Sequence, residues 1–205
     1  MAVESDAGRI NQKTRTRRAI VDACREIIRS GGPVTMPEVA AAALVSEATA
    51  YRYFPDLISL LHAAFVGLWP SPAEALDAVA DSGDPVERIG FACEFLLRGV
   101  LAYQGAVRAM ISATITRSEL AATRPGIRFG LIDEALAPLY DAPGVADRDD
   151  LAELKRDLSA VVSAEALFSL IDLSGVSPDD AIASLVRTAR TVTEAALRKG
   201  SSSGQ

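Results

Sequence analysis

The sequence predicts an all-α fold, and three observations support this. Ala and Leu dominate a composition that is 49% hydrophobic but only 5% aromatic, a balance that favours helices over strands. Apolar residues recur at steps of three and four, whereas no segment alternates between apolar and polar residues as a strand would. Gly and Pro interrupt the helical pattern between its segments.

Charge is distributed unevenly along the chain. Between Arg9 and Arg29 there are seven basic and two acidic residues, whereas from Phe54 onward there are 13 basic and 21 acidic residues. The net charge of −6 therefore does not exclude a nucleic-acid partner, because attraction to phosphate depends on where the charge lies. On charge alone, a solvated charged tail is the alternative interpretation of the basic segment.

The N-terminal segment is predicted to hold one long helix. Residues 1–11 are polar and are expected to be a disordered arm. A helix is predicted from Thr14 to Ser30, and Gly31-Gly32-Pro33 ends it, because glycine favours a C-cap and proline cannot continue a helix. The apolar face of this helix consists of Ile20, Cys24, Ile27 and Ile28.

Two short helices are predicted next. Thr35 is placed to cap the first of them, because Glu38 follows at the spacing of a capping box. This helix is Ala-rich and is expected to end near Ala43. Ser46 has the position of a new N-cap, and the following helix is predicted over residues 47–54.

A fourth helix is predicted from Asp56 to Leu68, and two prolines then separate residues 12–69 from the rest. Residues 70–199 are expected to form a larger helical domain, and the small, polar residues 200–205 a disordered tail. The helices of the larger domain are predicted near residues 73–81, 85–104, 105–118, 126–141, 149–173 and 178–199.

Residues 35–54 have the pattern of a helix-turn-helix, in which two short helices are joined by a tight turn. Ala40 and its neighbours are small enough for the two helices to cross closely, and Val45 is placed to be buried between them. The second helix offers hydrogen-bonding and aromatic groups rather than another apolar stripe. An ordinary helical hairpin packed in a bundle is the alternative.

Residues 14–65 resemble the N-terminal domain of the tetracycline-repressor (TetR) family. The resemblance is carried by TRRAIVDACREII, the Gly-Gly break, the Val-Ser turn, and Tyr-Arg-Tyr-Phe-Pro before a leucine-rich helix, in the family's order. It implies a three-helix DNA-binding domain and a helical C-terminal domain for effector binding and dimerisation. The protein would be a homodimeric transcriptional regulator, usually a repressor that a small-molecule effector releases from a palindromic operator in double-stranded DNA.

The resemblance assigns DNA contacts to the second short helix and its surroundings. Thr49 and Tyr51 would contact phosphates or base edges, and Glu47 would face the bases. The residues assigned to DNA binding are Arg15, Arg17, Arg18, Thr35, Ser46, Glu47, Ala48, Thr49, Tyr51, Arg52 and Tyr53.

Three residues depart from the family pattern. Leu44 stands where the family commonly has the turn glycine, so it must adopt either a less strained turn or a costly positive φ. Glu47 and Leu57 replace common lysines, which predicts weaker and less salt-sensitive DNA binding. Lys13 and the neighbouring arginines are placed to compensate from the flank. Glu47 is also able to accept a hydrogen bond from a cytosine amino group.

The last two helices carry long apolar stripes. Plain core is the usual explanation of such a stripe, but the family resemblance implies a two-fold dimer interface built from these helices. The residues assigned to the interface are Leu154, Leu158, Val161, Ile182, Leu185, Ala189 and Val192.

An effector pocket is expected in the helical C-terminal region, because ligand sites in bundles are apolar with a few polar groups. Plain core is the simpler interpretation of each lining residue taken alone. Glu165 lies in the apolar stretch VVSAEALF, and a buried carboxylate needs a partner, either Arg98, Arg108 or the effector. The residues assigned to the pocket are Phe91, Phe95, Tyr103, Met110, Thr114, Phe129, Glu165 and Phe168.

Other functions are disfavoured. One histidine, two cysteines without metal-ligand or redox spacing, and the lack of a Gly-rich phosphate loop predict no enzyme, metal or cofactor site. No signal peptide or membrane span is recognised, so a cytoplasmic protein without a membrane partner is expected. The main alternative to a regulator is a helical ligand-binding or scaffold protein whose helix-turn-helix has lost specific DNA affinity.

Overall fold

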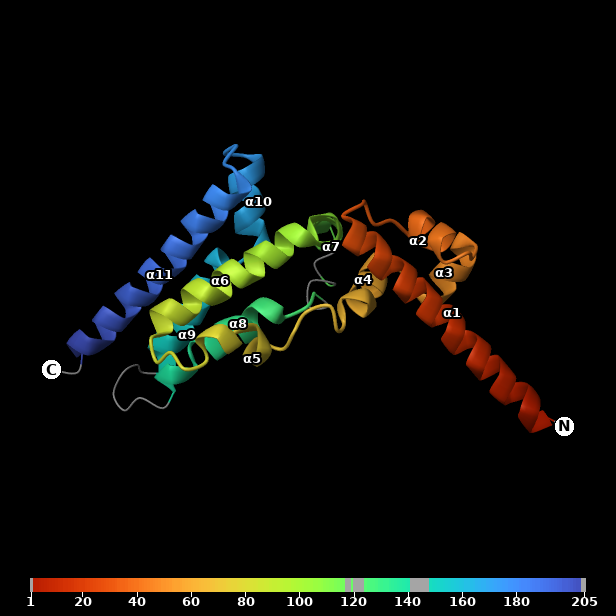
Figure 1. Cartoon of the computed structure of the whole chain (residues 1–205), viewed down its shortest axis with the longest axis horizontal. Helices are drawn as coiled ribbons and strands as arrows, with labels where there is room; N and C mark the ends of the chain where they lie inside the picture. Colours follow the sequence, from red (N-terminus) through yellow and green to blue (C-terminus); the bar gives the residue numbers. More distant parts are fainter. Residues whose placement is uncertain (1, 117–118, 120–123, 141–147, 204–205) are drawn as a thin grey trace. The chain divides into compact units, whose positions relative to one another are not determined.

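The structure is a computed structural model that describes residues 2–116, 119, 124–140 and 148–203. All regular secondary structure among these residues is helical, which confirms the all-α prediction (Figure 1). The chain divides into two compact units. The first comprises Met1–Trp69 and Ala102–Pro125, and the second comprises Pro70–Leu101 and Gly126–Gln205.

Helix α1 (Ala2–Ser30) is longer than predicted, so the expectation that residues 1–11 form a disordered arm is wrong from Ala2 onward. The C-terminal half of α1 buries its apolar face. The sequence of residues 2–13 is mostly polar or small, so the apolar pattern could not reveal this part of the helix. Extending an existing helix costs no new nucleation, and the Glu, Gln, Lys and Arg residues here are good helix formers.

Helices α2 (Met36–Ala42) and α3 (Glu47–Tyr53) begin at the predicted N-caps. The Thr35 hydroxyl accepts a hydrogen bond from the Glu38 N–H at 3.3 Å. The Ser46 hydroxyl accepts one from the Thr49 N–H at 3.2 Å. Both predicted caps are thus confirmed. The two helices pack against each other, and α2 also packs against α1.

The turn after α2 is a Schellman motif with leucine in the position that favours glycine. The Val45 N–H donates to the carbonyl of Ala40 (3.0 Å) and the Leu44 N–H donates to that of Ala41 (3.1 Å). Leu44 has a φ of 55° and is 92% exposed. Of the two outcomes expected at this position, the chain adopts the strained one.

Leu44→Gly is expected to raise the free energy of unfolding by about 0.5 to 1 kcal/mol. Relief of the left-handed strain outweighs the extra freedom of glycine in the unfolded chain, and little buried surface is lost. Urea denaturation followed by the fluorescence of Trp69 measures the change. Leu44→Ala is the control, because it keeps the Cβ and the strain. Equal stabilities of the Gly and Ala variants would contradict the prediction.

Helix α4 (Leu57–Phe65) is tied to α1 by one side chain. Arg25 donates from Nε to the carbonyl of Ala64 (3.0 Å) and from Nη2 to that of Val66 (2.8 Å). These carbonyls lie at the C-terminal end of α4, where a helix supplies no N–H partners. Arg25 therefore closes the end of α4 and joins it to α1.

Helix α7 (Gln104–Thr116) belongs to the first unit, although the predicted boundary at residue 69 left it out. It buries Ala106 and Met110 in the core shared with α1 and α4. At its start, a Cβ added to Gly105 would lie 2.7 Å from the carbonyl oxygen of Gly32, so glycine permits this close approach. This packing joins distant parts of the chain, and no local pattern predicts it.

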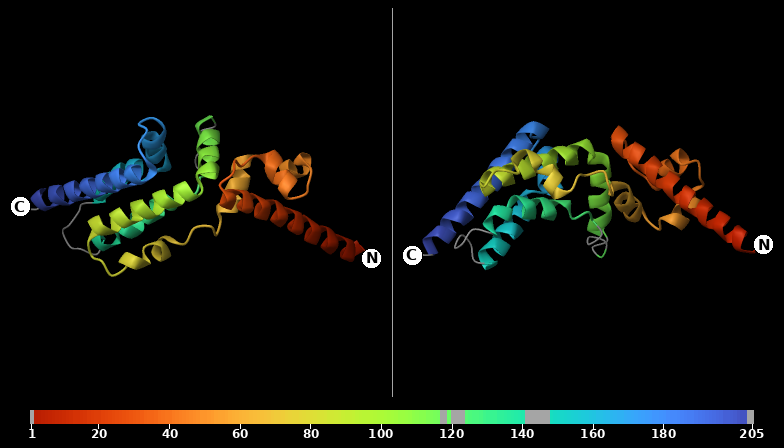
Figure 2. Two further views of the ribbon diagram at one scale, coloured as in Figure 1. Left: turned by 45° about the horizontal axis from the view of Figure 1, so that its top comes forward. Right: turned by 60° about the horizontal axis from the view of Figure 1, so that its bottom comes forward.

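The second unit is built around α11 (Pro178–Ser203), which packs against α9 (Arg148–Val161) and α10 (Ala164–Asp172). In Figure 2, α11 is the long blue helix near the C-terminus. It continues past residue 199, so the tail predicted from residue 200 is helical to Ser203. The other elements are α5 (Pro72–Ala75), η1 (Asp77–Val79), α6 (Pro85–Ala102), α8 (Ile127–Ala135) and η3 (Ala137–Leu139).

The single helix predicted over residues 149–173 is two helices. Ser163 interrupts it and caps α10, because its hydroxyl accepts a hydrogen bond from the Ala166 N–H at 3.1 Å. The helices predicted over 73–81 and 126–141 are likewise shorter α-helices, each followed by a 3-10 turn. Prolines and glycines marked the ends of the predicted elements, but a serine that restarts a helix inside an apolar run was missed.

Arg88 on α6 is a buried cation that the sequence pattern did not predict. It is 4% exposed, and its guanidinium donates to the carbonyls of Val79 (2.8 Å) and Ala80 (3.2 Å) at the end of η1. It also donates to the carbonyls of Glu134 (2.7 Å) and Ala135 (3.2 Å) at the end of α8. Arg88 thereby joins three separate segments of the second unit.

The two cysteines are buried, one in each unit. Burial raises the pKa of the Cys24 and Cys93 thiols to about 12, so both remain protonated at neutral pH. Among the described helices, none combines the length and the apolar character needed to cross a membrane.

Candidate functional site

Helix α3 presents one side to the core and the other to solvent. Ala50 is fully buried and lets α3 approach its neighbours closely, while Phe54, the residue after the helix, is 2% exposed. Tyr51 is 47% exposed despite its aromatic ring. The exposed residues of the helix are Glu47, Ala48, Tyr51 and Arg52.

The hydroxyl groups at the start of α3 bond to each other. Ser46 Oγ and Thr49 Oγ1 are 2.9 Å apart, and Ser46 also caps the helix. Thr49 is half-buried, while Ser46 and Thr35 are exposed. The two caps therefore fix the starts of α2 and α3 and keep the side chains of Thr35 and Ser46 at the surface.

The basic residues of α1 differ in their surroundings. The guanidinium carbon of Arg17 lies 4.9 Å from the centroid of the Phe54 ring, a cation–π contact that links α1 to the end of α3. Arg18 instead lies 3.7 Å from the Asp22 carboxylate on its own helix. The Phe54 contact was missed at the level of sequence, because the periodicity of α1 does not reveal its neighbour.

All the residues assigned to DNA contact lie in the first unit, and none of them is buried. Arg52 extends over the ring of Tyr53, with 5.7 Å between the guanidinium carbon and the ring centroid. The structure thus leaves the assigned side chains at the surface of one compact body.

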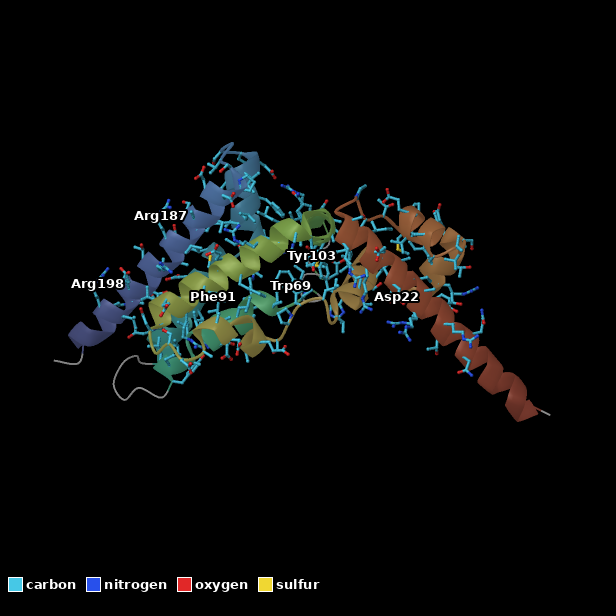
Figure 3. All side chains as sticks on the ribbon, in the orientation of Figure 1. Asp22, Trp69, Phe91, Tyr103, Arg187 and Arg198 are labelled. Atoms are coloured by element: carbon cyan, nitrogen blue, oxygen red, sulfur yellow. The ribbon has the colours of Figure 1, made fainter. Side chains whose placement is uncertain are left out.

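The residues assigned to an effector pocket are divided between the units. Tyr103, Met110 and Thr114 lie in the first unit, and the others lie in the second. Tyr103 makes edge-on ring contacts with Trp69 and Phe65, with centroid distances of 5.9 and 6.3 Å (Figure 3). Met110 is buried in the core of the first unit, which agrees with the alternative that it is a plain core residue rather than a pocket residue.

Thr114 is buried, and its hydrogen bonds are local. Its hydroxyl donates to the carbonyl of Met110 at 2.8 Å and accepts from Nε of Arg124 at 2.6 Å. Both partners belong to the first unit. The polar group of Thr114 is therefore satisfied by the protein itself.

Glu165 is not the buried carboxylate that was predicted. Its side chain is 41% exposed, and its Oε2 lies 3.6 Å from Nη1 of Arg128. The predicted partner Arg98 pairs instead with Glu94 and Asp179. The break at Ser163 resets the helical register, which places Glu165 at the surface. A single continuous helix through VVSAEALF was therefore the wrong basis for the prediction.

The remaining pocket residues of the second unit do not share one environment. Phe168 is buried, whereas Phe91 and Phe95 are half-buried. Phe129 is exposed, and the guanidinium carbon of Arg128 lies 4.8 Å from its ring centroid. Phe129 is consequently a surface residue of α8 rather than a core residue.

The stripe assigned to a dimer interface is mostly buried within the single chain, where α9 and α11 pack together. This burial needs no partner, so most of the stripe is unavailable for a dimer contact. Val161 and Val192 are half-buried. The buried residues of the stripe are Leu154, Leu158, Ile182, Leu185 and Ala189.

Within the described residues, no group of three or more His, Cys, Asp or Glu side chains is placed to hold a metal ion. No family model matches the chain, and no curated protein matches it.

Proposed function

We propose that the chain is a DNA-binding transcriptional regulator of the tetracycline-repressor type, in which α2 and α3 form a helix-turn-helix. The observation that carries the proposal is the two-sided environment of α3. Ala50 and Phe54 fix one side in the core, while Tyr51 and its exposed neighbours face solvent. The major groove of DNA admits one α-helix, so a helix held in this way is suited to enter it.

The exposed side chains of α3 offer the chemistry that groove recognition uses. Tyr51 and Arg52 carry donors for phosphate oxygens, and Glu47 carries an acceptor that suits a cytosine amino group. Ala48 is small and apolar, which suits contact with a thymine methyl group. The charges of Glu47 and Arg52 cancel. Most of the electrostatic attraction to phosphate must therefore come from residues outside α3.

Two copies of the chain are proposed to act together. One recognition helix reads one half-site, and a dimer reaches two half-sites separated by about one DNA turn. Because the stripe between α9 and α11 is buried inside the chain, we place the dimer contact on side chains that α10 leaves accessible. Leu170 is half-buried there, and Leu173, just past the helix, is exposed.

Repression, and release by a small-molecule effector, follow from the resemblance to the tetracycline-repressor family. The residues assigned to the pocket are divided between two units, and Glu165 lies at the surface. An effector that releases DNA must bind more tightly to the state that does not fit the operator.

The second candidate function is a helical scaffold or ligand-binding protein without specific DNA affinity. Two positions favour it. Glu47 puts a negative charge at the exposed start of α3, and Leu57 packs against the core instead of offering a cation. The two functions differ in sequence-specific DNA binding. A regulator should bind a particular duplex, whereas a scaffold should retain DNA only nonspecifically.

Tyr51→Ala is expected to weaken DNA binding about tenfold, since it removes one phosphate or base contact from α3. Fluorescence anisotropy measures this on a labelled duplex that the wild-type chain recovers from a random-sequence pool. The free energy of unfolding should change by less than about 0.5 kcal/mol, because the side chain is 47% exposed.

Tyr140→Ala is the matched control, because Tyr140 is an equally exposed tyrosine, at 52%, in the second unit. It should leave the affinity unchanged. Failure of the wild-type chain to recover any duplex supports the scaffold instead. If both tyrosine variants bind DNA as the wild type does, α3 is not the reading surface.

A further inference from the structure

We propose that α1 carries a row of two cations, Lys13 and Arg17, that binds the phosphate backbone of duplex DNA beside the bases read by α3. The two other basic residues of this segment, Arg15 and Arg18, belong to the opposite face and do not take part. This inference rests on the proposed function, because it assigns phosphate contacts to the same DNA-binding unit.

The register of α1 defines the row. Residues 13, 17, 20, 24 and 28 follow one another at steps of three or four, so they lie along one face of the helix. Ile20, Cys24 and Ile28 on this face are buried in the core of the first unit. Lys13 and Arg17 continue the same face and are exposed. The face that packs on the core thus becomes cationic beyond the edge of the core.

Arg17 is held next to α3. Its guanidinium lies over the ring of Phe54, 4.9 Å from the centroid, and Phe54 is the C-cap residue of α3. Stacking uses the flat face of the guanidinium and leaves its edge to donate hydrogen bonds. A cation held in this way loses less side-chain entropy when it binds a phosphate.

Lys13 lies about one helical turn before Arg17 on the same helix, α1. Four residues of helix correspond to about 6 Å along the axis. Each DNA strand carries one phosphate per about 3.4 Å of its axis, so two cations at this separation both have phosphates within reach. The row supplies the positive charge that the exposed face of α3 lacks.

The opposite face of α1 is partly compensated by its own acids, because Asp22 and Glu26 stand beside its three arginines. Residues 15, 18, 22, 26 and 29 follow a second row at steps of three or four. Arg18 lies 3.7 Å from Asp22, and Arg29 lies 3.2 Å from Glu26. These exposed pairs reduce the net charge of the face. Arg15 and Arg18 lie on this solvated, mixed-charge face, and we therefore leave them out of the row.

Two double variants of the full chain test the assignment, because both remove two positive charges from the same helix. Lys13→Ala with Arg17→Ala should reduce the slope of log affinity against log salt by about 2, since each phosphate contact contributes about 0.9. Affinity at about 0.15 M salt should fall by about 10- to 30-fold. Arg15→Ala with Arg18→Ala should change the slope by less than about 0.5.

Two single variants separate charge from packing. Arg17→Lys keeps the charge and should keep most of the slope, whereas Lys13→Ala should lower the slope by about 1 without touching the core. Equal slope losses for the two double variants, or a larger loss for the Arg15 and Arg18 pair, would overturn the row while leaving the regulator intact. Failure of the wild-type chain to bind any duplex overturns both the proposed function and the row.

Discussion

Arg88→Met is expected to lower the free energy of unfolding by about 3 to 5 kcal/mol. The guanidinium is almost fully buried and donates to four backbone carbonyls, two at the end of η1 and two at the end of α8. Methionine has a similar shape but donates no hydrogen bond. All four carbonyls would then lose their donor in a place that water reaches poorly.

Urea denaturation followed by far-ultraviolet circular dichroism measures this loss. Arg156→Met is the control, because Arg156 is an exposed arginine of the same unit. Its replacement should change the stability by less than about 0.5 kcal/mol. Arg88→Lys should recover only part of the loss, because an ammonium group cannot span four carbonyls. Equal stabilities of the Arg88→Met and Arg156→Met variants would show that the Arg88 network does not hold the second unit together.

Phe54→Ala is expected to destabilise the first unit by about 3 to 5 kcal/mol. Phe54 is 2% exposed and anchors the end of α3, so its truncation leaves a cavity that the neighbouring helices fill only in part. The variant also removes the ring beneath Arg17. Stability and DNA affinity should therefore fall together, because the exposed face of α3 depends on this anchor.

Trp69, the sole tryptophan, lies in the same unit, and its fluorescence in urea reports the transition. Phe54→Leu should cost less, about 1 to 2 kcal/mol, because most of the apolar volume remains. Tyr51→Ala serves as the contrasting variant, with a loss of affinity but little loss of stability. The anchoring role of Phe54 is excluded if Phe54→Ala proves as stable as Tyr51→Ala.

Local features of the fold could be predicted because neighbouring residues determine them. The caps at Thr35 and Ser46 depend on hydrogen bonds to residues three positions away. The buried face of α1 follows from residues at helical spacing. The choice at Leu44, between a relaxed turn and a positive φ, was also recognised, although only the structure could decide it.

Features that depend on distant contacts could not be predicted. The packing of α7 within the first unit depends on the close approach of Gly105 to Gly32, which is far away in the sequence. Arg88 finds its acceptors on segments before and well after it. The stripe of α11 was assigned to a partner subunit, whereas α9 of the same chain already covers it.

The candidate site shows the same division. The exposed residues of α3 were identified from a local motif, and they do lie at the surface. The distinction between Arg17 and Arg18 depends on contacts with Phe54 and Asp22. The contact of Arg17 with Phe54 joins α1 to the end of α3, which is distant in sequence. Counting charges along the sequence could therefore not distinguish Arg17 from Arg18.

Selection of sequences from a random duplex pool tests most directly whether the exposed face of α3 reads DNA. The wild-type chain is compared with a triple variant, Glu47→Ala, Tyr51→Ala and Arg52→Ala, which leaves the buried side of the helix unchanged. We expect the wild type to enrich an inverted repeat and the folded triple variant to enrich no sequence. A wild-type chain that enriches no sequence, or a triple variant that enriches the same repeat, would contradict the central claim.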